Sequence, residues 1–180
     1  MQIKITEVGP RDGLQIEKSF IPTARKVQLI DALFHAGIRS VEATSFVSPT
    51  AVPQMADAAD VVQRISRPEG SVVSVLAPNV RGAHDAIRAG ADELVAFVSA
   101  SATHNRKNLN RSIADSLINI EAVADVAFQH RIPVRGAIST VFGCPFEGDV
   151  DASSVVGIVQ ALSRIGIRHV TLADTTGMAT

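Results

Sequence analysis

Alternating strand and helix signals predict an α/β fold with a parallel sheet for this chain of 180 residues. The strand-like segments are rich in Val and Ile, as expected of parallel strands that are buried on both faces. Gly37, Gly90 and Gly166 stand a few residues before strand-like segments, where the end of a helix favours a residue with positive φ. These observations predict repeated βα units. They leave open whether the sheet is doubly wound or curls into a barrel.

Six segments are predicted as strands because they are short runs of β-branched residues. Helices are predicted between them, because apolar residues recur there at intervals of three and four. The strands are expected over residues 3–8, 40–44, 72–76, 94–98, 134–141 and 169–173, and the helices over residues 27–34, 55–65, 81–89, 113–127 and 155–165.

The composition, with 46% hydrophobic and 19% charged residues, excludes a disordered chain. Lys and Arg number 17 against 18 Asp and Glu, so we expect neither nucleic acid nor an anionic membrane surface as a partner. The single cysteine, Cys144, cannot form an internal disulfide, and neither a leader nor an apolar run of about 18 residues is evident. We therefore expect a reduced, cytoplasmic protein with one domain over residues 1–180.

Polar residues concentrate where the predicted strands end. In any parallel α/β architecture these carboxyl ends meet on one face, which is where binding and catalytic groups gather. Arg11 and Asp12 follow the first strand, Glu42 and Ser45 lie at the end of the second, and Asp174 follows the sixth. A permanent guanidinium cation and a hard oxygen ligand on successive residues can point to different sides of one pocket. The alternative is a simple Asp-Gly turn beside a solvated arginine.

Several segments together carry a family resemblance. Residues 7–15 read Glu-Val-Gly-Pro-Arg-Asp-Gly-Leu-Gln, and residues 41–49 read Val-Glu-Ala-Thr-Ser-Phe-Val-Ser-Pro. With the segments at 52–55, 107–110, 134–136, 143–148 and 174–177, they resemble the hydroxymethylglutaryl-CoA lyases from residue 3 almost to the end of the chain. Related lyases, aldolases and synthases share the Arg-Asp-Gly turn in a Thr-Leu-Arg-Asp-Gly setting, so the Gly-Pro-Arg-Asp-Gly-Leu-Gln version is the more specific signal.

The resemblance implies a (β/α)8 TIM barrel that splits 3-hydroxy-3-methylglutaryl-CoA into acetoacetate and acetyl-CoA, a reaction of leucine degradation. It implies a divalent cation, Mg²⁺ or Mn²⁺, with Asp12 as a metal ligand, and a homodimer when the protein is complete. Arg11, Glu42 and Asp174 would be catalytic, with Arg11 also steadying the thioester oxygen. The substrate would be lined by polar side chains at Gln15, Ser45, Ser101, Asn108 and Arg135.

Two features of the family have no counterpart here. The family places two metal ligands in a His-x-His pair after the seventh strand and its reacting cysteine in a Gly-Gly-Cys-Pro loop after the eighth. The five histidines of this chain show no such spacing, and Cys144 matches a segment after the fifth strand. Because six βα units in 180 residues leave room for two more in a barrel of about 250, we expect a barrel domain that is incomplete at its C-terminal end and inactive by itself.

Two alternatives stay open. The chain could come from a related lyase or condensing enzyme that acts on another acyl-CoA or a keto acid. It could also be a catalytically silent fragment that associates through open sheet edges, because an incomplete parallel barrel leaves unpaired strands.

Overall fold

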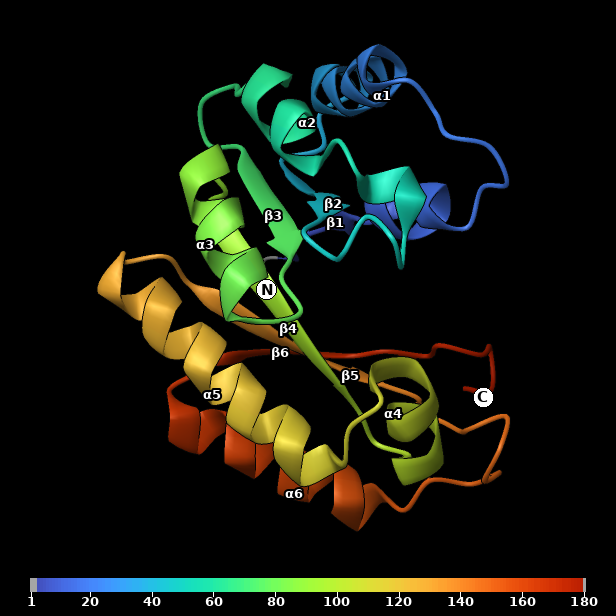
Figure 1. The fold of residues 1–180 in the computed structure, drawn as a ribbon. Helices are drawn as coiled ribbons and strands as arrows, with labels where there is room; N and C mark the ends of the chain where they lie inside the picture. Colours follow the sequence, from blue (N-terminus) through green and yellow to red (C-terminus); the bar gives the residue numbers. More distant parts are fainter. Residues whose placement is uncertain (1–2, 180) are drawn as a thin grey trace. The chain divides into compact units, whose positions relative to one another are not determined.

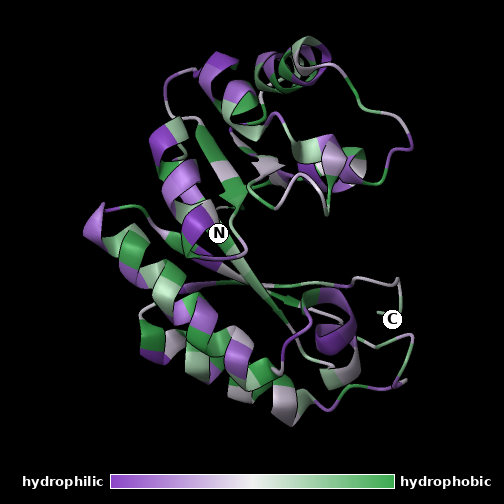
Figure 2. Cartoon of the chain, in the orientation of Figure 1, coloured by the Kyte–Doolittle hydropathy of each residue, from purple (hydrophilic) through white to green (hydrophobic). Residues whose placement is uncertain are grey.

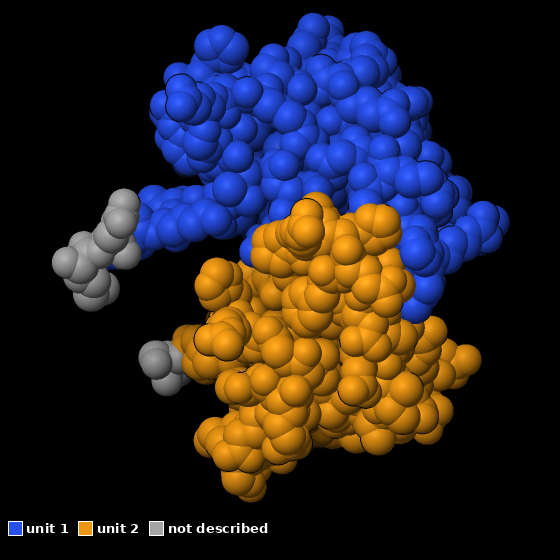
Figure 3. All heavy atoms as spheres, turned by 90° about the vertical axis from the view of Figure 1, so that its left-hand side faces the viewer, with its two compact units in different colours: residues 1–94 blue, residues 95–180 orange. Residues whose placement is uncertain are grey.

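The computed structural model of the protein describes residues 3–179, and the chain forms two compact units. The first unit extends to Leu94 and the second begins at Val95 (Figure 3). Strand β4, Glu93–Ser99, begins just before this division. No helix among the described residues is long and apolar enough to cross a membrane.

The first unit is a parallel sheet whose successive strands are also neighbours in space (Figure 1). Strand β1, Thr6–Glu7, pairs with β2, Ser40–Ser45, which in turn pairs with β3, Val72–Leu76. Every residue of β2 is buried. The register between β2 and β3 shifts between Glu42 and Thr44. This local irregularity lies beside Glu42, one of the predicted catalytic residues.

Three helices accompany these strands: α1 over Thr23–His35, α2 over Ala58–Arg64 and α3 over Val80–Ala89. Their inward side chains bury a core with the strands that includes Ile30, Val41, Val61, Val73 and Ala86. Two short helical turns lie in the loops after β1 and β2. They are a π-helical turn, η1, over Gly9–Gly13 and a 3-10 turn, η2, over Pro53–Met55.

A buried ion pair ties α1 to the segment before α2. Lys26 Nζ lies 2.5 Å from Asp57 Oδ1, and it also donates to the backbone carbonyl of Gln54. Asp57 Oδ2 accepts a hydrogen bond from the Thr23 hydroxyl at 2.7 Å. Because the side chains of Lys26 and Asp57 are only 3% and 9% exposed, each charge depends on the other for compensation.

The second unit repeats the same pattern. Strand β5, Val134–Ser139, pairs in parallel with β6, His169–Leu172. Ala100, directly after β4, donates its backbone N–H to the carbonyl of Ser139. Its helices are α4 over Ala102–Leu109, α5 over Ile113–Gln129 and α6 over Ala152–Ile165. Helix α5 begins with a reciprocal capping box between Ser112 and Asp115.

Most of the predicted elements are present with small shifts at their ends. The three glycines expected at helix ends do have positive φ, at 96° for Gly37, 92° for Gly90 and 95° for Gly166. The strand expected over residues 3–8 was too long, since only Thr6–Glu7 pair. Helix α4, which follows β4, is not among the predicted helices. It is largely hydrophilic, whereas β3 is mostly hydrophobic (Figure 2), so apolar spacing could not reveal it.

Candidate functional site

The turn after β1 is held by the last residue of that strand. The backbone N–H groups of Arg11 and Asp12 both donate to the carbonyl of Val8, at 3.0 and 2.8 Å. Glu7 Oε1 accepts from the backbone N–H of Gly9 at 2.7 Å, and a Cβ at Gly9 would lie only 2.9 Å from that oxygen. The Gly residue therefore lets the carboxylate close over the turn.

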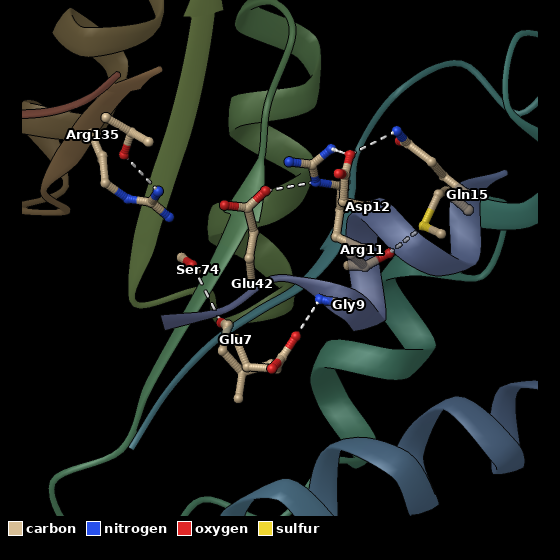
Figure 4. A network of polar contacts seen from close by, with 12 residues as sticks. Glu7, Gly9, Arg11, Asp12, Gln15, Glu42, Ser74 and Arg135 are labelled. Atoms are coloured by element: carbon tan, nitrogen blue, oxygen red, sulfur yellow. Dashed lines mark hydrogen bonds and ion pairs between the residues drawn. The ribbon is translucent and has the colours of Figure 1, made fainter. Parts of the chain in front are cut away.

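Arg11 is oriented by two carboxylates (Figure 4). Its Nε donates to Glu42 Oε1 at 2.6 Å, and its Nη1 donates to Asp12 Oδ1 at 2.5 Å. Gln15 Nε2 donates to the same Asp12 oxygen at 3.1 Å. The structure thus brings four of the predicted site residues together. It also corrects one expectation: Arg11 and Asp12 do not face different sides but pair with each other, because they lie in a π-helical turn rather than on an extended strand end.

Burial differs sharply across this group, which we call the arginine cluster: Arg11, Asp12, Gln15 and Glu42. The Glu42 side chain is 2% exposed and that of Arg11 16%, whereas the Asp12 side chain is 58% exposed. The guanidinium is therefore anchored on its buried side and reaches solvent through Asp12. This anchoring restricts the rotamers of the Arg11 side chain. The free-energy cost of reorienting the guanidinium when a ligand binds is therefore small.

Ser45, at the end of β2, is distinctive among the residues that the structure describes. Its Oγ is a buried side-chain oxygen without a hydrogen-bond partner, although buried polar groups are nearly always paired. Ser45 also lines a cavity of about 550 Å³ within the first unit, together with Phe46, Asn79 and Arg81. Arg11 does not line this cavity. The buried hydroxyl is thus available to a group that the chain itself does not supply.

The remaining predicted residues belong to the second unit. Ser101 caps helix α4, where its Oγ accepts from the backbone N–H of His104 at 3.0 Å and from the Cys144 thiol at 3.0 Å. Asn108 is exposed on the same helix. Arg135 Nη1 donates to Thr171 Oγ1 at 3.1 Å, which joins neighbouring positions of β5 and β6.

Asp174, just after β6, is tied to its own loop. Its carboxylate accepts from the backbone N–H of Met178 at 2.9 Å and of Ala179 at 3.2 Å. These backbone donors, Met178 first, hold the pKa of the Asp174 carboxyl below its usual value. The group is therefore ionised at neutral pH and accepts hydrogen bonds.

A hydrogen-bonded chain at the ends of β4, β5 and β6 was not predicted. Ser99 Oγ lies 2.9 Å from His104 Nδ1 and 2.8 Å from Thr140 Oγ1, and the backbone N–H of Thr140 donates to Thr175 Oγ1 at 2.9 Å. We call Ser99, His104, Thr140 and Thr175 the hydroxyl network. Burial lowers the pKa of His104, so this imidazole is neutral at pH 7. The sequence does show polar residues at these strand ends. Their positions alone do not indicate which of these side chains form hydrogen bonds with one another.

The predicted ligand of a divalent cation in the arginine cluster is the carboxylate of Asp12. Its Oδ1 already accepts from Arg11 and Gln15. Among residues 3–179 no group of three or more His, Cys, Asp or Glu side chains is placed to hold a metal ion. The described residues therefore do not complete a metal site on their own, since hard divalent cations need several oxygen or nitrogen ligands.

Comparison with known proteins now places this arrangement in a family. Residues 2–180 match the HMGL-like family. The chain belongs to the HMGL-like family. Members of the HMGL-like family generally depend on a divalent metal.

Individual relatives agree with this assignment. The chain is 48% identical over 178 residues to a zebrafish (Danio rerio) protein called 3-hydroxy-3-methylglutaryl-CoA lyase, cytoplasmic; that alignment covers 99% of this chain and 53% of the relative. The chain spans 38% to 60% of the length of the curated relatives that it matches.

Solved structures of HMGL-like proteins show the same fold. A crystal structure of hydroxymethylglutaryl-CoA lyase from Pseudomonas aeruginosa superimposes with a TM-score of 0.96 at 44% identity, over 99% of this chain and 60% of that protein. An HMG-CoA lyase from Acinetobacter baumannii, solved with coenzyme A and 3-methylmalate, gives 0.94 at 41% identity over 98% of this chain and 58% of that one. The fold is therefore that of a TIM barrel of which this chain forms six βα units, as predicted.

Proposed function

We propose that the complete protein containing this chain is a carbon-carbon lyase that cleaves 3-hydroxy-3-methylglutaryl-CoA into acetoacetate and acetyl-CoA. The observation that carries the proposal is the buried Arg11–Glu42 ion pair on a chain 44–48% identical to lyases named for that reaction. A retro-Claisen cleavage places negative charge on the thioester oxygen of the departing enolate. A cation that is already fixed in position stabilises that charge without reorganising.

Arg11 is the group that would meet the enolate oxygen. Glu42 holds the Nε side of the guanidinium, and this leaves the Nη side to face the substrate and Asp12. The reaction also removes the proton of a tertiary alcohol as the carbon-carbon bond breaks. Asp174, the carboxylate that follows β6, is the residue that we assign to accepting or relaying that proton.

Five polar residues are proposed to line the substrate: Gln15, Ser45, Ser101, Asn108 and Arg135. Ser45 has the strongest support, because its Oγ is buried without a hydrogen-bond partner and the residue borders a cavity. A substrate oxygen could form a hydrogen bond with the Ser45 hydroxyl. Leaving such a buried group unpaired costs about 1–3 kcal/mol. Ser101 already has a structural role, because its Oγ caps α4 and accepts a hydrogen bond from the Cys144 thiol. A contact with substrate would be additional to that role.

Asp12 is proposed as one ligand of Mg²⁺ or Mn²⁺, with the other ligands supplied from outside this chain. Such a cation, when bound, would acidify the hydroxyl of the substrate. We also propose a single catalytic barrel with residues 1–180 as its first part, assembled as a homodimer in the complete protein. The cytoplasmic location proposed here rests on similarity to the zebrafish relative, and the place in leucine degradation follows from the reaction.

The test compares three proteins in an assay for acetoacetate release with Mg²⁺. They are residues 1–180 alone, the complete gene product, and a chimera in which residues 1–180 are joined to the remaining part of the Pseudomonas lyase. We expect no activity from the first and activity from the other two. A folded complete protein that leaves hydroxymethylglutaryl-CoA intact would overturn the proposal.

A panel of substrates decides between this reaction and the first alternative. Turnover of another acyl-CoA or a keto acid, but not of hydroxymethylglutaryl-CoA, would favour a related lyase or condensing enzyme. The silent-fragment alternative would be favoured if mass spectrometry of cells finds only the 180-residue species and sedimentation shows it in a defined oligomer.

A further inference from the structure

Thr140, directly after β5, combines complete burial with an unusual backbone conformation. Its exposure is 0% and its φ is +57°. A β-branched residue rarely adopts positive φ, so the surrounding structure must hold Thr140 there. The backbone ladder of β5 and β6 continues on either side of it, because Ala173 donates to the carbonyl of Ile138 and Val141 donates to that of Ala173. At Thr140 itself the N–H turns to the side chain of Thr175 instead, at 2.9 Å.

The hydroxyl of Thr140 has a defined proton order. Its Oγ1 donates to the carbonyl of Ser139 at 2.7 Å, so the contact with Ser99 must be donated by Ser99. With its only proton used, Ser99 Oγ can only accept at its contact with His104, which therefore carries its proton on Nδ1. The hydroxyl network thus runs in one direction, from His104 through Ser99 to Thr140.

Two faces of Thr140 therefore join three strand ends within the second unit. Its hydroxyl connects β5 to the end of β4, and its N–H connects β5 to the loop after β6. Thr175, the acceptor of that N–H, is the residue next to Asp174. The Asp174 carboxylate is held by the N–H groups of Met178 and Ala179, and the side chain of the adjacent Thr175 is held by the N–H of Thr140.

We propose that Thr140 is a positioning residue for the lyase reaction: its hydroxyl network and its N–H to Thr175 hold Asp174 where the proton must be handled. This inference rests on the proposed function, and it assigns a role to a residue that does not itself touch substrate. A shift of about 1 Å in a catalytic group can lower a rate by about 100-fold, so a residue that only positions Asp174 can still affect kcat strongly.

The kinetic test uses the complete enzyme and three variants. Thr140→Val keeps the shape and the backbone strain but removes the hydroxyl, and we expect kcat to fall at least about tenfold while KM stays within about twofold. Thr140→Ser restores the hydroxyl and should restore kcat. Thr103→Val in helix α4, outside the hydroxyl network, is the control and should change neither constant. An unchanged kcat in Thr140→Val, or no rescue by Ser, would overturn the proposal.

A double-mutant cycle separates positioning from general destabilisation. In an Asp174→Asn background, Thr140→Val should cause no further loss of kcat, because the group that it positions is already disabled. An equal loss in both backgrounds would show that Thr140 acts only through stability. Ser99→Ala interrupts the same network from β4, and should repeat the result if Thr140→Val does not fold.

The tautomer of His104 provides a readout that needs no activity. Nitrogen-15 chemical shifts of the imidazole should show a protonated Nδ1 in the wild type. In Thr140→Val, Ser99 loses its acceptor and should donate to His104, which moves the proton to Nε2. Unchanged shifts would overturn the network. If the wild type itself lacks lyase activity, the proposed function and the positioning role both fail, while the shifts still decide whether the network is correctly described.

Discussion

Arg11 Nε lies 2.6 Å from Oε1 of Glu42, a carboxylate that is almost fully buried in β2. The contact joins the turn after the first strand to the second strand, 31 residues away in sequence. A buried carboxylate would be costly alone, and the guanidinium compensates it. The same contact that neutralises Glu42 therefore also fixes the direction of Arg11.

Arg11→Lys in the complete enzyme should reduce kcat by about 100-fold or more while KM changes little, because a lysine ammonium cannot reproduce the fixed fork. Glu42→Gln should cause a smaller loss, since the amide oxygen can still accept from Nε. Steady-state kinetics with hydroxymethylglutaryl-CoA measure both. A lysine variant with wild-type kcat would remove Arg11 from the proposed role.

The buried Lys26–Asp57 ion pair should contribute far more to stability than the exposed Arg88–Asp85 ion pair. Asp57→Ala leaves the Lys26 charge buried without compensation and should lower the free energy of unfolding by about 3–5 kcal/mol. The matched control is Asp85→Ala, which removes the partner of Arg88 in an exposed pair on α3 and should cost no more than about 1 kcal/mol. Urea denaturation compares them, and equal losses would contradict the expectation.

Two helical glycines should respond oppositely to alanine. A Cβ at Gly82 in α3 would lie 2.7 Å from the backbone oxygen of Phe46, so Gly82→Ala should destabilise the fold despite the better helix propensity of alanine. Gly157 in α6 has no such neighbour within 4 Å, and Gly157→Ala should stabilise by about 0.5–1 kcal/mol. Thermal denaturation shows whether each substitution raises or lowers the melting temperature. A stabilised Gly82→Ala protein would mean that the segment carrying Phe46 can move away.

His104 should make the stability of the folded protein depend on pH in the mildly acidic range. Burial lowers its pKa in the folded state, so the unfolded state binds more protons between the folded pKa and the ordinary value near 6.5. Its contribution is therefore fully present above about pH 6.5 and is lost as the pH falls toward the folded pKa. The melting temperature of His104→Gln should decline less from pH 7.5 to 5.5 than that of the wild type. Parallel declines would show that other groups control this range.

The sequence was most informative where local signals and packing agree. The strand at 72–76 was predicted with its observed bounds, because four of its five residues are buried and apolar or small. Residues 134–141 were predicted too long at their end, because nothing in the residue types shows that Thr140 turns to positive φ and ends β5 at Ser139. Periodicity detects burial, and it does not detect a backbone conformation imposed by tertiary hydrogen bonds.

The candidate site was predicted in part for a similar reason. Arg11, Asp12, Gln15 and Glu42 were all selected, and they do meet. The mutual pairing of Arg11 and Asp12 was not expected, since a π-helical turn has no simple sequence signature. The hydroxyl network was missed because Ser and Thr are common at strand ends, and only three-dimensional contacts distinguish the members that bond to one another.

The capping box of α5 bears on how the second unit folds. Ser112 and Asp115 are three residues apart, so their reciprocal hydrogen bonds can form before any strand has paired. The helix that follows has 17 residues, beyond the length of about 12–15 at which isolated helices are marginal. Pairing of Arg135 with His169, by contrast, must first close a loop of about thirty residues. During synthesis, α5 should therefore be the first ordered segment of this half, and the strands that carry the polar residues should assemble onto it later.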